Sequence, residues 1–283
     1  MGGRERASSI AGRDRISDAP GVRIGVRIVA SAADAAARLA ALPDVARQAE
    51  SLGFDLLVVP ERLSAEGGAP AALPACAAAA AATERLRVAT GLLALPLHHP
   101  LRVAEDAATL DALSGGRFEL GVGLGAEVEA FAGFGLDVRE RAARFEEALA
   151  VVRRAWRDGP VGFEGRHFRC TDVEVHPKPV QAGGPPLWLG ARSGEALARA
   201  AALEVGVVLE TDTDPAPYLA AWRSEAPPRL AFLLESGSDA AGVAALGARL
   251  ARARGAETDV WLAASGATPA LAALAERLRA LAR

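Results

Sequence analysis

Two kinds of ionisable side chain follow apolar runs in this sequence, at places where a buried strand would end. Glu61 comes directly after the run 55–60, and His98 and His99 follow the run 86–95. A carboxylate or an imidazole in such a place can accept a proton or bind a polar group of a ligand. The alternatives are a rim salt bridge for Glu61 and a capping or packing role for His99. Because no Cys, Asp or Glu joins the two histidines at a familiar spacing, no metal site is predicted.

Small residues at the ends of two other runs would let the backbone approach a ligand closely. A glycine inside the run 86–95, in Thr90-Gly91-Leu92, indicates a bulge or such a close approach. The segment 121–126 reads G-V-G-L-G-A and matches the dinucleotide-binding pattern G-x-G-x-x-A. That pattern belongs to the first strand–helix unit of its fold, whereas here it falls in the fourth. We therefore favour a close ligand approach at Gly123 and Leu124, with an NAD-binding enzyme as an alternative.

A third group of small residues precedes a predicted helix. Gly190, Ala191, Arg192 and Ser193 follow a short apolar run and lead into the helix 193–203. Backbone N–H groups at a helix N-terminus, with a serine and an arginine beside them, are suited to binding a phosphate. The alternative is that Ser193 caps the helix and Arg192 is solvated.

These residues must be positioned by the strands and helices that the rest of the pattern predicts. Short apolar runs alternate with longer amphipathic segments along the chain. The predicted strands are 22–30, 55–60, 86–95, 117–123, 187–190, 205–209, 229–234 and 259–263. The predicted helices are 44–52, 71–82, 100–113, 139–156, 193–203, 215–223, 239–254 and 269–282.

Alternation of strands and helices predicts a parallel sheet and the α/β class. Eight such units over about 260 residues are typical of a (β/α)8 TIM barrel, whose site lies at the C-terminal ends of its strands. An open doubly wound sheet is the alternative. The segment 159–186 is rich in Pro and Gly and reads as an inserted excursion between units four and five. We expect residues 1–21 to form a disordered tail and residues 22–283 to form one barrel domain.

The composition of the chain indicates which partners and which cellular compartment to expect. The formal net charge of −3 provides no basic excess for nucleic acid, and no run of about 18 apolar residues predicts a membrane span. Residues 1–21 mix acidic and basic side chains and contain no apolar core of a secretory signal. Cys76 and Cys170 are far apart in the sequence and read as inert thiols of a reducing cytoplasm.

Taken together, these segments resemble the luciferase-like monooxygenase family. The resemblance covers roughly residues 22–209, and it is specific because the segments occur in combination. The matching segments are Ala49–Asp55 before Pro60-Glu61, Thr90-Gly91, Pro96, His99-Pro100, Ser114–Phe118, Leu120–Gly123, Arg141–Leu149, Phe163–Phe168, His176–Gln181 and Pro186–Gly190.

The resemblance implies a barrel that binds reduced FMN or the deazaflavin coenzyme F-420. It places Thr90, Gly91 and Leu92 at a bulge, often with a non-prolyl cis peptide, beneath the flavin ring. The other residues it places near the ring and the phosphate are Gly123, Leu124, Gly190, Ala191, Arg192 and Ser193. His99 and Glu61 would be the polar groups nearest the reaction.

The leading functional prediction is a flavin-dependent monooxygenase, in which reduced flavin and O2 oxidise a small organic substrate. The family allows a flavin reductase as supplier of reduced flavin, and a homodimer. One alternative is hydride transfer to or from coenzyme F-420. Another is a catalytically degenerate flavin-binding barrel, which is favoured by two departures from the family pattern, Arg62 and Leu124.

Overall fold

The structure is a computed structural model that describes residues 22–28, 35–62, 71–210, 212–234, 246, 249–250, 253, 255–264 and 269–281. The predicted tail 1–21 and most of the predicted helix 239–254 lie outside these residues. The division into a tail and one barrel domain therefore stays a prediction.

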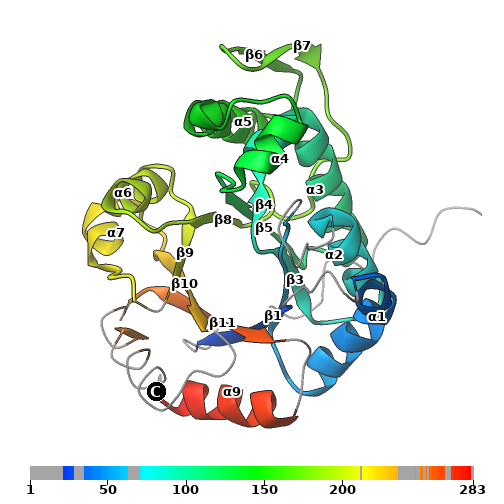
Figure 1. Ribbon diagram of the computed structural model, residues 1–283, viewed down its shortest axis with the longest axis vertical. Coiled ribbons are helices and arrows are strands. Elements are labelled where there is room, and N and C mark those ends of the chain that lie inside the picture. Colours follow the sequence, from blue (N-terminus) through cyan, green and yellow to red (C-terminus); the bar gives the residue numbers. More distant parts are fainter. Residues whose placement is uncertain are drawn as a thin grey trace, which may run out of the picture.

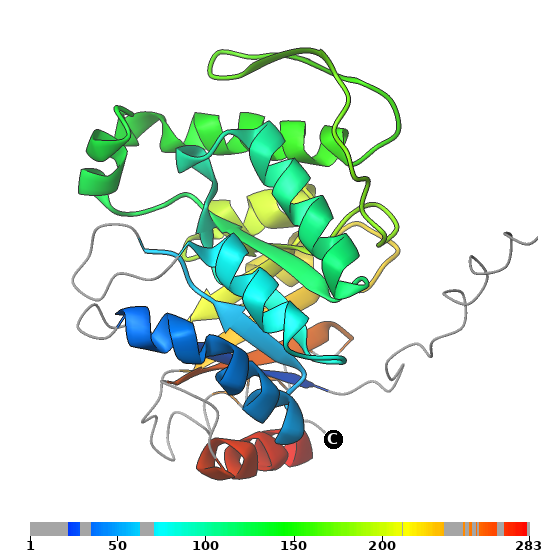
Figure 2. The same ribbon diagram turned by 90° about the vertical axis from the view of Figure 1, so that its right-hand side faces the viewer.

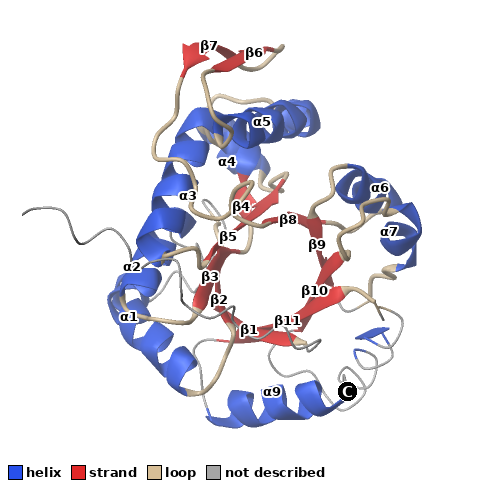
Figure 3. Cartoon of the chain, turned by 180° about the vertical axis from the view of Figure 1, so that it is seen from behind, coloured by secondary structure: helices blue, strands red, loops and turns tan. Residues whose placement is uncertain are grey.

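The described strands close into a parallel barrel (Figures 1 and 3). β3 and β4 are successive parts of one broken strand, and both pair with β5, so the barrel has eight strand positions. Closure confirms the (β/α)8 fold and contradicts the open doubly wound sheet, on which the NAD-binding alternative depended. The barrel strands are β1 (Arg23–Ile28), β2 (Leu56–Val59), β3 (Arg87–Thr90), β4 (Leu93–Ala94), β5 (Phe118–Gly123), β8 (Leu187–Gly190), β9 (Gly206–Glu210), β10 (Arg229–Leu234) and β11 (Glu257–Ala264).

Helices cover the outside of this barrel. They are α1 (Ala35–Ser51), α2 (Ala72–Ala81), α3 (Pro100–Ser114), α4 (Val128–Gly133), α5 (Arg141–Ala155), α6 (Gly194–Ala202), α7 (Ala216–Ala221) and α9 (Pro269–Leu281), with the 3-10 helices η2 (Leu95–Leu97) and η3 (Val138–Glu140). None of the helices in the described ranges is both long enough and apolar enough to cross a bilayer.

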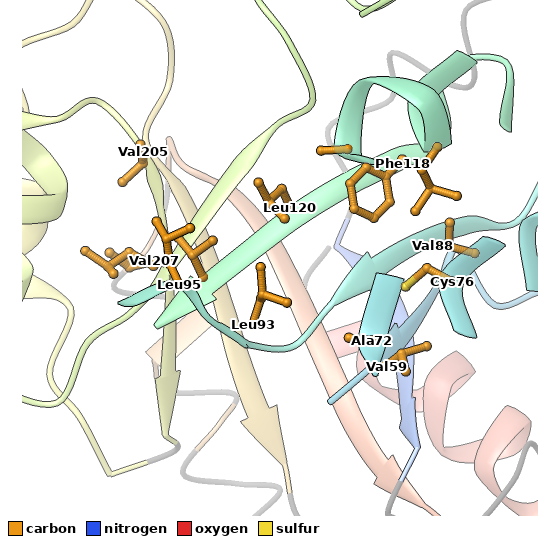
Figure 4. Close-up of a cluster of buried hydrophobic side chains, with 14 of the residues drawn as sticks. Val59, Ala72, Cys76, Val88, Leu93, Leu95, Phe118, Leu120, Val205 and Val207 are labelled. Atoms are coloured by element: carbon orange, nitrogen blue, oxygen red, sulfur yellow. The ribbon is translucent and has the colours of Figure 1, made fainter. Parts of the chain in front are cut away.

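The strands are apolar on both faces because each face packs against protein. All four residues of β2 are buried. Successive side chains point to opposite sides of a strand, so one set fills the barrel and the other meets the helices. The inner set contains Leu56, Val58, Ala89, Trp188, Ala231 and Trp261. Figure 4 shows part of the outer set, where Val88 and Phe118 lie near Cys76 of α2. Burial raises the pKa of the Cys76 and Cys170 thiols, and neither forms a disulfide.

α1 begins at Ala35, nine residues before the predicted start at Asp44, and contains Pro43. Proline has no backbone N–H to donate within a helix, so a sequence-based prediction usually places a helix boundary next to it. Leu42, Ala46 and Ala49 are nevertheless buried on one side of α1. Their packing against the barrel stabilises a helix that the local sequence alone does not favour.

The predicted excursion between units four and five is confirmed. It forms an antiparallel hairpin of β6 (Val161–Glu164) and β7 (Arg169–Val173), which stands outside the helix layer beyond α5 (Figures 1 and 2). Glu147 of α5 holds the turn, because its carboxylate accepts the backbone N–H groups of Arg166, His167 and Phe168.

An ionic cluster fills the N-terminal end of the barrel. Glu119 is fully buried and contacts the guanidinium groups of Arg23, Arg87 and Arg229. Burial alone would raise the pKa of Glu119, but the three arginines outweigh it and hold that pKa well below its usual value. The Trp188 indole also donates a hydrogen bond to this carboxylate, at 2.6 Å. Because this end of the barrel is filled, we look for the functional site at the C-terminal ends of the strands.

Candidate active site

The C-terminal ends of the strands form the face that we call the barrel mouth. It is built from residues that end or follow β1, β2, β3, β5, β8 and β9. Ligands of (β/α)8 barrels bind at this face because its loops are free to vary while the strands stay fixed. The residues predicted for the site all belong to these strand ends or to the loops that follow them.

The break between β3 and β4 is a bulge with a cis peptide bond between Gly91 and Leu92. This confirms the predicted bulge. A Cβ at Gly91 would lie 2.1 Å from Cγ1 of Val58, so only glycine fits at this point. Thr90 is buried, and its hydroxyl both donates to the Gly121 carbonyl (2.7 Å) and accepts from the Gly121 N–H (2.9 Å). The hydroxyl of Thr90 thus joins β3 to β5.

The side chain of Leu92 lies across the glycines of the neighbouring strands. A Cβ on Gly190 would be 2.4 Å from Cδ1 of Leu92, and one on Gly123 would be 3.4 Å from the same atom. The sequence predicted that these glycines admit a ligand. The structure shows that they first admit Leu92, which is half-buried and therefore also presents apolar surface at the mouth.

Glu61 pairs with His98. The Glu61 side chain is only 4% exposed, and its Oε2 lies 3.1 Å from Nε2 of His98, which is 30% exposed. The same oxygen accepts the backbone N–H of Ala94 at 3.0 Å, so Glu61 also fixes β4 just after the bulge. The sequence pointed to both histidines at this place, and the catalytic role was predicted for His99 rather than for His98. Adjacency to His99 was the available signal, but the direction of either ring depends on the turn η2.

A second carboxylate lies near His98. Burial raises the pKa of Asp106 on α3, against the opposing charges of Arg102 and His98. His98 thus interacts with a carboxylate on each of two elements, Glu61 after β2 and Asp106 on α3.

His99 lies apart from Glu61. It is the residue before α3, its carbonyl accepts the N–H groups of Arg102 and Val103, and its ring packs edge-on against Phe168 with ring centroids 5.9 Å apart. The Arg144 guanidinium lies over the same Phe168 ring, 4.9 Å from its centroid. These contacts are those of the packing alternative, and a catalytic role for His99 stays a prediction.

Arg62 and Glu127 bridge the rim of the mouth. Nε of Arg62, after β2, lies 3.2 Å from Oε1 of Glu127, which precedes α4. The ion pair joins the loop after β2 to the loop after β5. Leu124 lies in the latter loop, half-buried against the apolar core.

The predicted phosphate cradle lies at the start of α6. Ser193 caps this helix, since its hydroxyl accepts the N–H of Ala196 at 3.3 Å, which confirms the capping alternative. The space beside Gly194 is open: apart from its chain neighbours and the backbone of α6, no heavy atom lies within 4 Å of where a Cβ would lie. Arg192 is 83% exposed and pairs with Glu210 at the end of β9. Ala191 is buried and its N–H bonds to Val208. Phosphate binding here stays a prediction.

Over the described ranges, no group of three or more His, Cys, Asp or Glu side chains is placed to hold a metal ion. Three pairs of oppositely charged or titratable side chains lie among the described residues of the mouth. These pairs are Glu61 with His98, Arg62 with Glu127, and Arg192 with Glu210.

Comparison with known proteins gives a family and two kinds of relative. A sequence model of the family described as luciferase-like monooxygenase matches residues 22–227. The F420-dependent glucose-6-phosphate dehydrogenase of Beutenbergia cavernae is 40% identical over 152 residues, which are 48% of this chain and 45% of that protein. The 4-hydroxyprotoasukamycin monooxygenase of Streptomyces nodosus subsp. asukaensis is 36% identical, over 51% of this chain and 39% of that protein. The chain thus spans about half the length of the curated relatives that it matches.

Solved structures show the same fold. The monooxygenase RslO1 from Streptomyces bottropensis superimposes with a TM-score of 0.73 at 24% identity, covering 91% of this chain and 97% of that one. An F420-dependent secondary alcohol dehydrogenase, in complex with an F420-acetone adduct, gives a TM-score of 0.72 at 18% identity, over 93% and 99% of the two chains.

Proposed function

Since the chain belongs to the luciferase-like monooxygenase family, we propose that it is a flavin-dependent oxidoreductase in which reduced FMN and O2 oxidise a small organic substrate. The observation that carries the proposal is that the family match, residues 22–227, includes every strand from β1 to β9. These strands supply the Glu61–His98 pair, the bulge at Gly91 and the start of α6 to a single face of the barrel.

The donors at the start of α6 fit the phosphate of FMN. The first turn of a nine-residue helix provides backbone N–H groups and a favourable dipole for an anion. The open space beside Gly194 leaves room for it, and exposed Arg192 can exchange Glu210 for a phosphate. We assign phosphate binding to Gly190, Ala191, Arg192 and Ser193.

The bulge fits an aromatic ring. Val58 and Trp261 form a fully buried apolar layer beneath Gly91, and Leu92 continues this surface toward Gly190. We assign contact with the flavin ring to Thr90, Gly91, Leu92, Gly123 and Leu124. When bound, the flavin supplies the electron transfer and the activation of O2, which no side chain of the protein can supply.

The residues of the chain itself position the reactants and hold a proton. The Glu61 carboxylate orients the His98 ring through Nε2, and the partial exposure of His98 lets that ring exchange a proton with a ligand in the mouth. The apolar layer of Val58, Trp261 and Leu92 excludes water from the floor of the mouth. We keep His99 as a second candidate for the proton-handling role.

A second candidate function is hydride transfer to or from coenzyme F-420. It is favoured by the relative at 40% identity, which is named an F420-dependent dehydrogenase. A third, a catalytically degenerate flavin-binding barrel, is favoured by Arg62 and Leu124, because Arg62 is held by Glu127 and Leu124 brings no charge to the mouth.

The monooxygenase function implies particular partners. A monooxygenase that takes up reduced FMN needs a reductase that supplies it, and we propose such a partner in the cytoplasm. We also propose a homodimer, as the resemblance implied.

Fluorescence titration of the purified protein with FMN, coenzyme F-420 and NAD tests the proposal. Micromolar binding of FMN supports the monooxygenase, and binding of coenzyme F-420 alone supports hydride transfer. Flavin binding without turnover of any substrate supports the degenerate barrel. If the protein binds neither FMN nor coenzyme F-420, all the flavin-dependent proposals are overturned.

A further inference from the structure

An arginine, Arg27, stands at the mouth end of β1 on the strand's inner face. Arg23, four residues earlier on the same strand, donates a hydrogen bond to Glu119 inside the barrel. A Cβ on Gly25, between the two arginines, would contact Trp261 in the barrel interior. Residues two apart on a strand share a face, so Arg27 also points inward. In the register of the barrel it lies beside Val58 of β2 and Ala263 of β11.

The guanidinium of Arg27 reaches the bulge. Its Nε donates a hydrogen bond to the Gly91 carbonyl at 3.3 Å, and this carbonyl belongs to the Gly91–Leu92 peptide. Val58 and Trp261, which lie beneath Gly91, are fully buried and apolar. An arginine keeps its positive charge at all physiological pH values, and next to an apolar layer that charge acts over a longer range than it would in water.

We propose that Arg27 is the residue that stabilises the reduced form of the cofactor relative to the oxidised form. This inference rests on the proposed function. Two-electron reduction of FMN at neutral pH adds two electrons and one proton to the ring, so the ring gains one negative charge. A cation held beside the ring-binding bulge lowers the energy of that added charge and so tunes the electronics of the cofactor. Arg27 is therefore a tuning residue, distinct from the proton-handling pair Glu61–His98.

The experiment compares the affinities of the oxidised and reduced cofactor in wild type and variants. FMN and coenzyme F-420 are titrated in both redox states, the reduced forms under anaerobic conditions, with fluorescence or calorimetry as readout. Arg27→Gln removes the charge, Arg27→Lys keeps it, and Arg27→Met provides a second uncharged variant should the first fail to fold. Arg62→Met is the matched control, because it removes the same charge from the next strand end but is held away by Glu127.

Loss of the charge at Arg27 should weaken binding of the reduced form about tenfold more than binding of the oxidised form. By linkage this tenfold change lowers the midpoint potential of the bound two-electron couple by about 30 mV. Arg27→Lys should restore most of the ratio, and Arg62→Met should change it less than threefold.

The possible outcomes distinguish failure of the proposal for Arg27 from failure of the proposed function. If the wild type binds neither cofactor, the proposed function fails and the inference fails with it. If the wild type binds a cofactor but Arg27→Gln and Arg27→Met leave the ratio of affinities unchanged, the inference alone is overturned. Equal shifts in the Arg27 and Arg62 variants would also overturn it, because they would assign the effect to rim charge in general.

Discussion

At the scale of single residues, the two neighbouring histidines 98 and 99 have different surroundings. His98 faces the buried carboxylate of Glu61, and the ring of His99 packs edge-on against Phe168. Replacing each by glutamine gives a matched pair of variants. His98→Gln should lower kcat/KM by tenfold or more, since a positioned acid–base group typically contributes about 10²–10⁴-fold.

His99→Gln should instead lower stability by about 0.5–1.5 kcal/mol, the usual contribution of an edge-on aromatic contact, with little change in turnover. Steady-state kinetics and urea denaturation of both variants provide the comparison. A large loss of turnover in His99→Gln with none in His98→Gln would instead support the catalytic role that the sequence suggested for His99.

Glu119 presents a prediction about stability and pH. Its pKa is held well below the usual value by three arginines, so its contribution to stability is complete above the unfolded-state pKa of about 4.3 and is lost as the pH falls below that value. Glu119→Gln leaves three buried or half-buried guanidinium groups without this carboxylate and should cost about 3–5 kcal/mol at pH 7.

Urea denaturation of wild type and Glu119→Gln at pH 7 and at pH 3.5 measures this effect. The difference in unfolding free energy should shrink at the lower pH, because the Glu119 carboxyl of the unfolded chain binds a proton there while that of the folded barrel stays ionised. A difference that stays constant with pH would show that packing of the side chain, and not its charge, stabilises the barrel.

At the scale of elements, the broken strand β3–β4 decides how tightly its neighbours can pack. A Cβ on Gly121 would lie 2.1 Å from the backbone oxygen of Thr90, which cannot move without disturbing β3. A Cβ on Gly190 would lie 2.4 Å from the end of the Leu92 side chain, which can rotate. Gly121→Ala should therefore destabilise the protein by about 3 kcal/mol, and Gly190→Ala by less than about 1 kcal/mol.

Thermal and urea unfolding of the two alanine variants test this contrast. Gly190→Ala should also weaken cofactor binding, because displaced Leu92 enters the mouth, and Leu92→Ala in the same chain should relieve the effect. Equal destabilisation by both substitutions would mean that Leu92 is as rigid as the backbone of β3.

The elements also show where sequence-based prediction worked and where it stopped. Strands such as 56–59 were predictable because burial on both faces leaves a continuous apolar run. The bulge at Gly91 was predictable because a glycine interrupts such a run. The start of α1 was missed because Pro43 masks a helix that tertiary packing stabilises. The Glu61–His98 pair and the place of Arg27 depend on contacts between elements far apart in the sequence, which local spacing does not encode.

At the scale of the whole molecule, ring closure joins the mouth to the entire fold. β1 pairs with β11 over six residue pairs, so the first and the last strands of the barrel support each other. A ligand that bridges the bulge after β3 and the start of α6 would contact strand ends on both sides of β5. Its binding energy should therefore appear in the stability of the barrel as a whole.

A ligand present at 100 times its Kd adds about 2.7 kcal/mol to the unfolding free energy of the form that binds it. For a domain of this size that corresponds to a rise in Tm of about 5–10 °C. We expect this rise with FMN or coenzyme F-420 and none with NAD, because the described strands form a closed barrel and not the open doubly wound sheet of the dinucleotide-binding fold. Calorimetry of the wild type checks the rise, and Arg192→Glu, which places a negative charge at the start of α6, should reduce it. A rise that Arg192→Glu leaves intact would move the phosphate away from α6 while keeping the cofactor in the mouth.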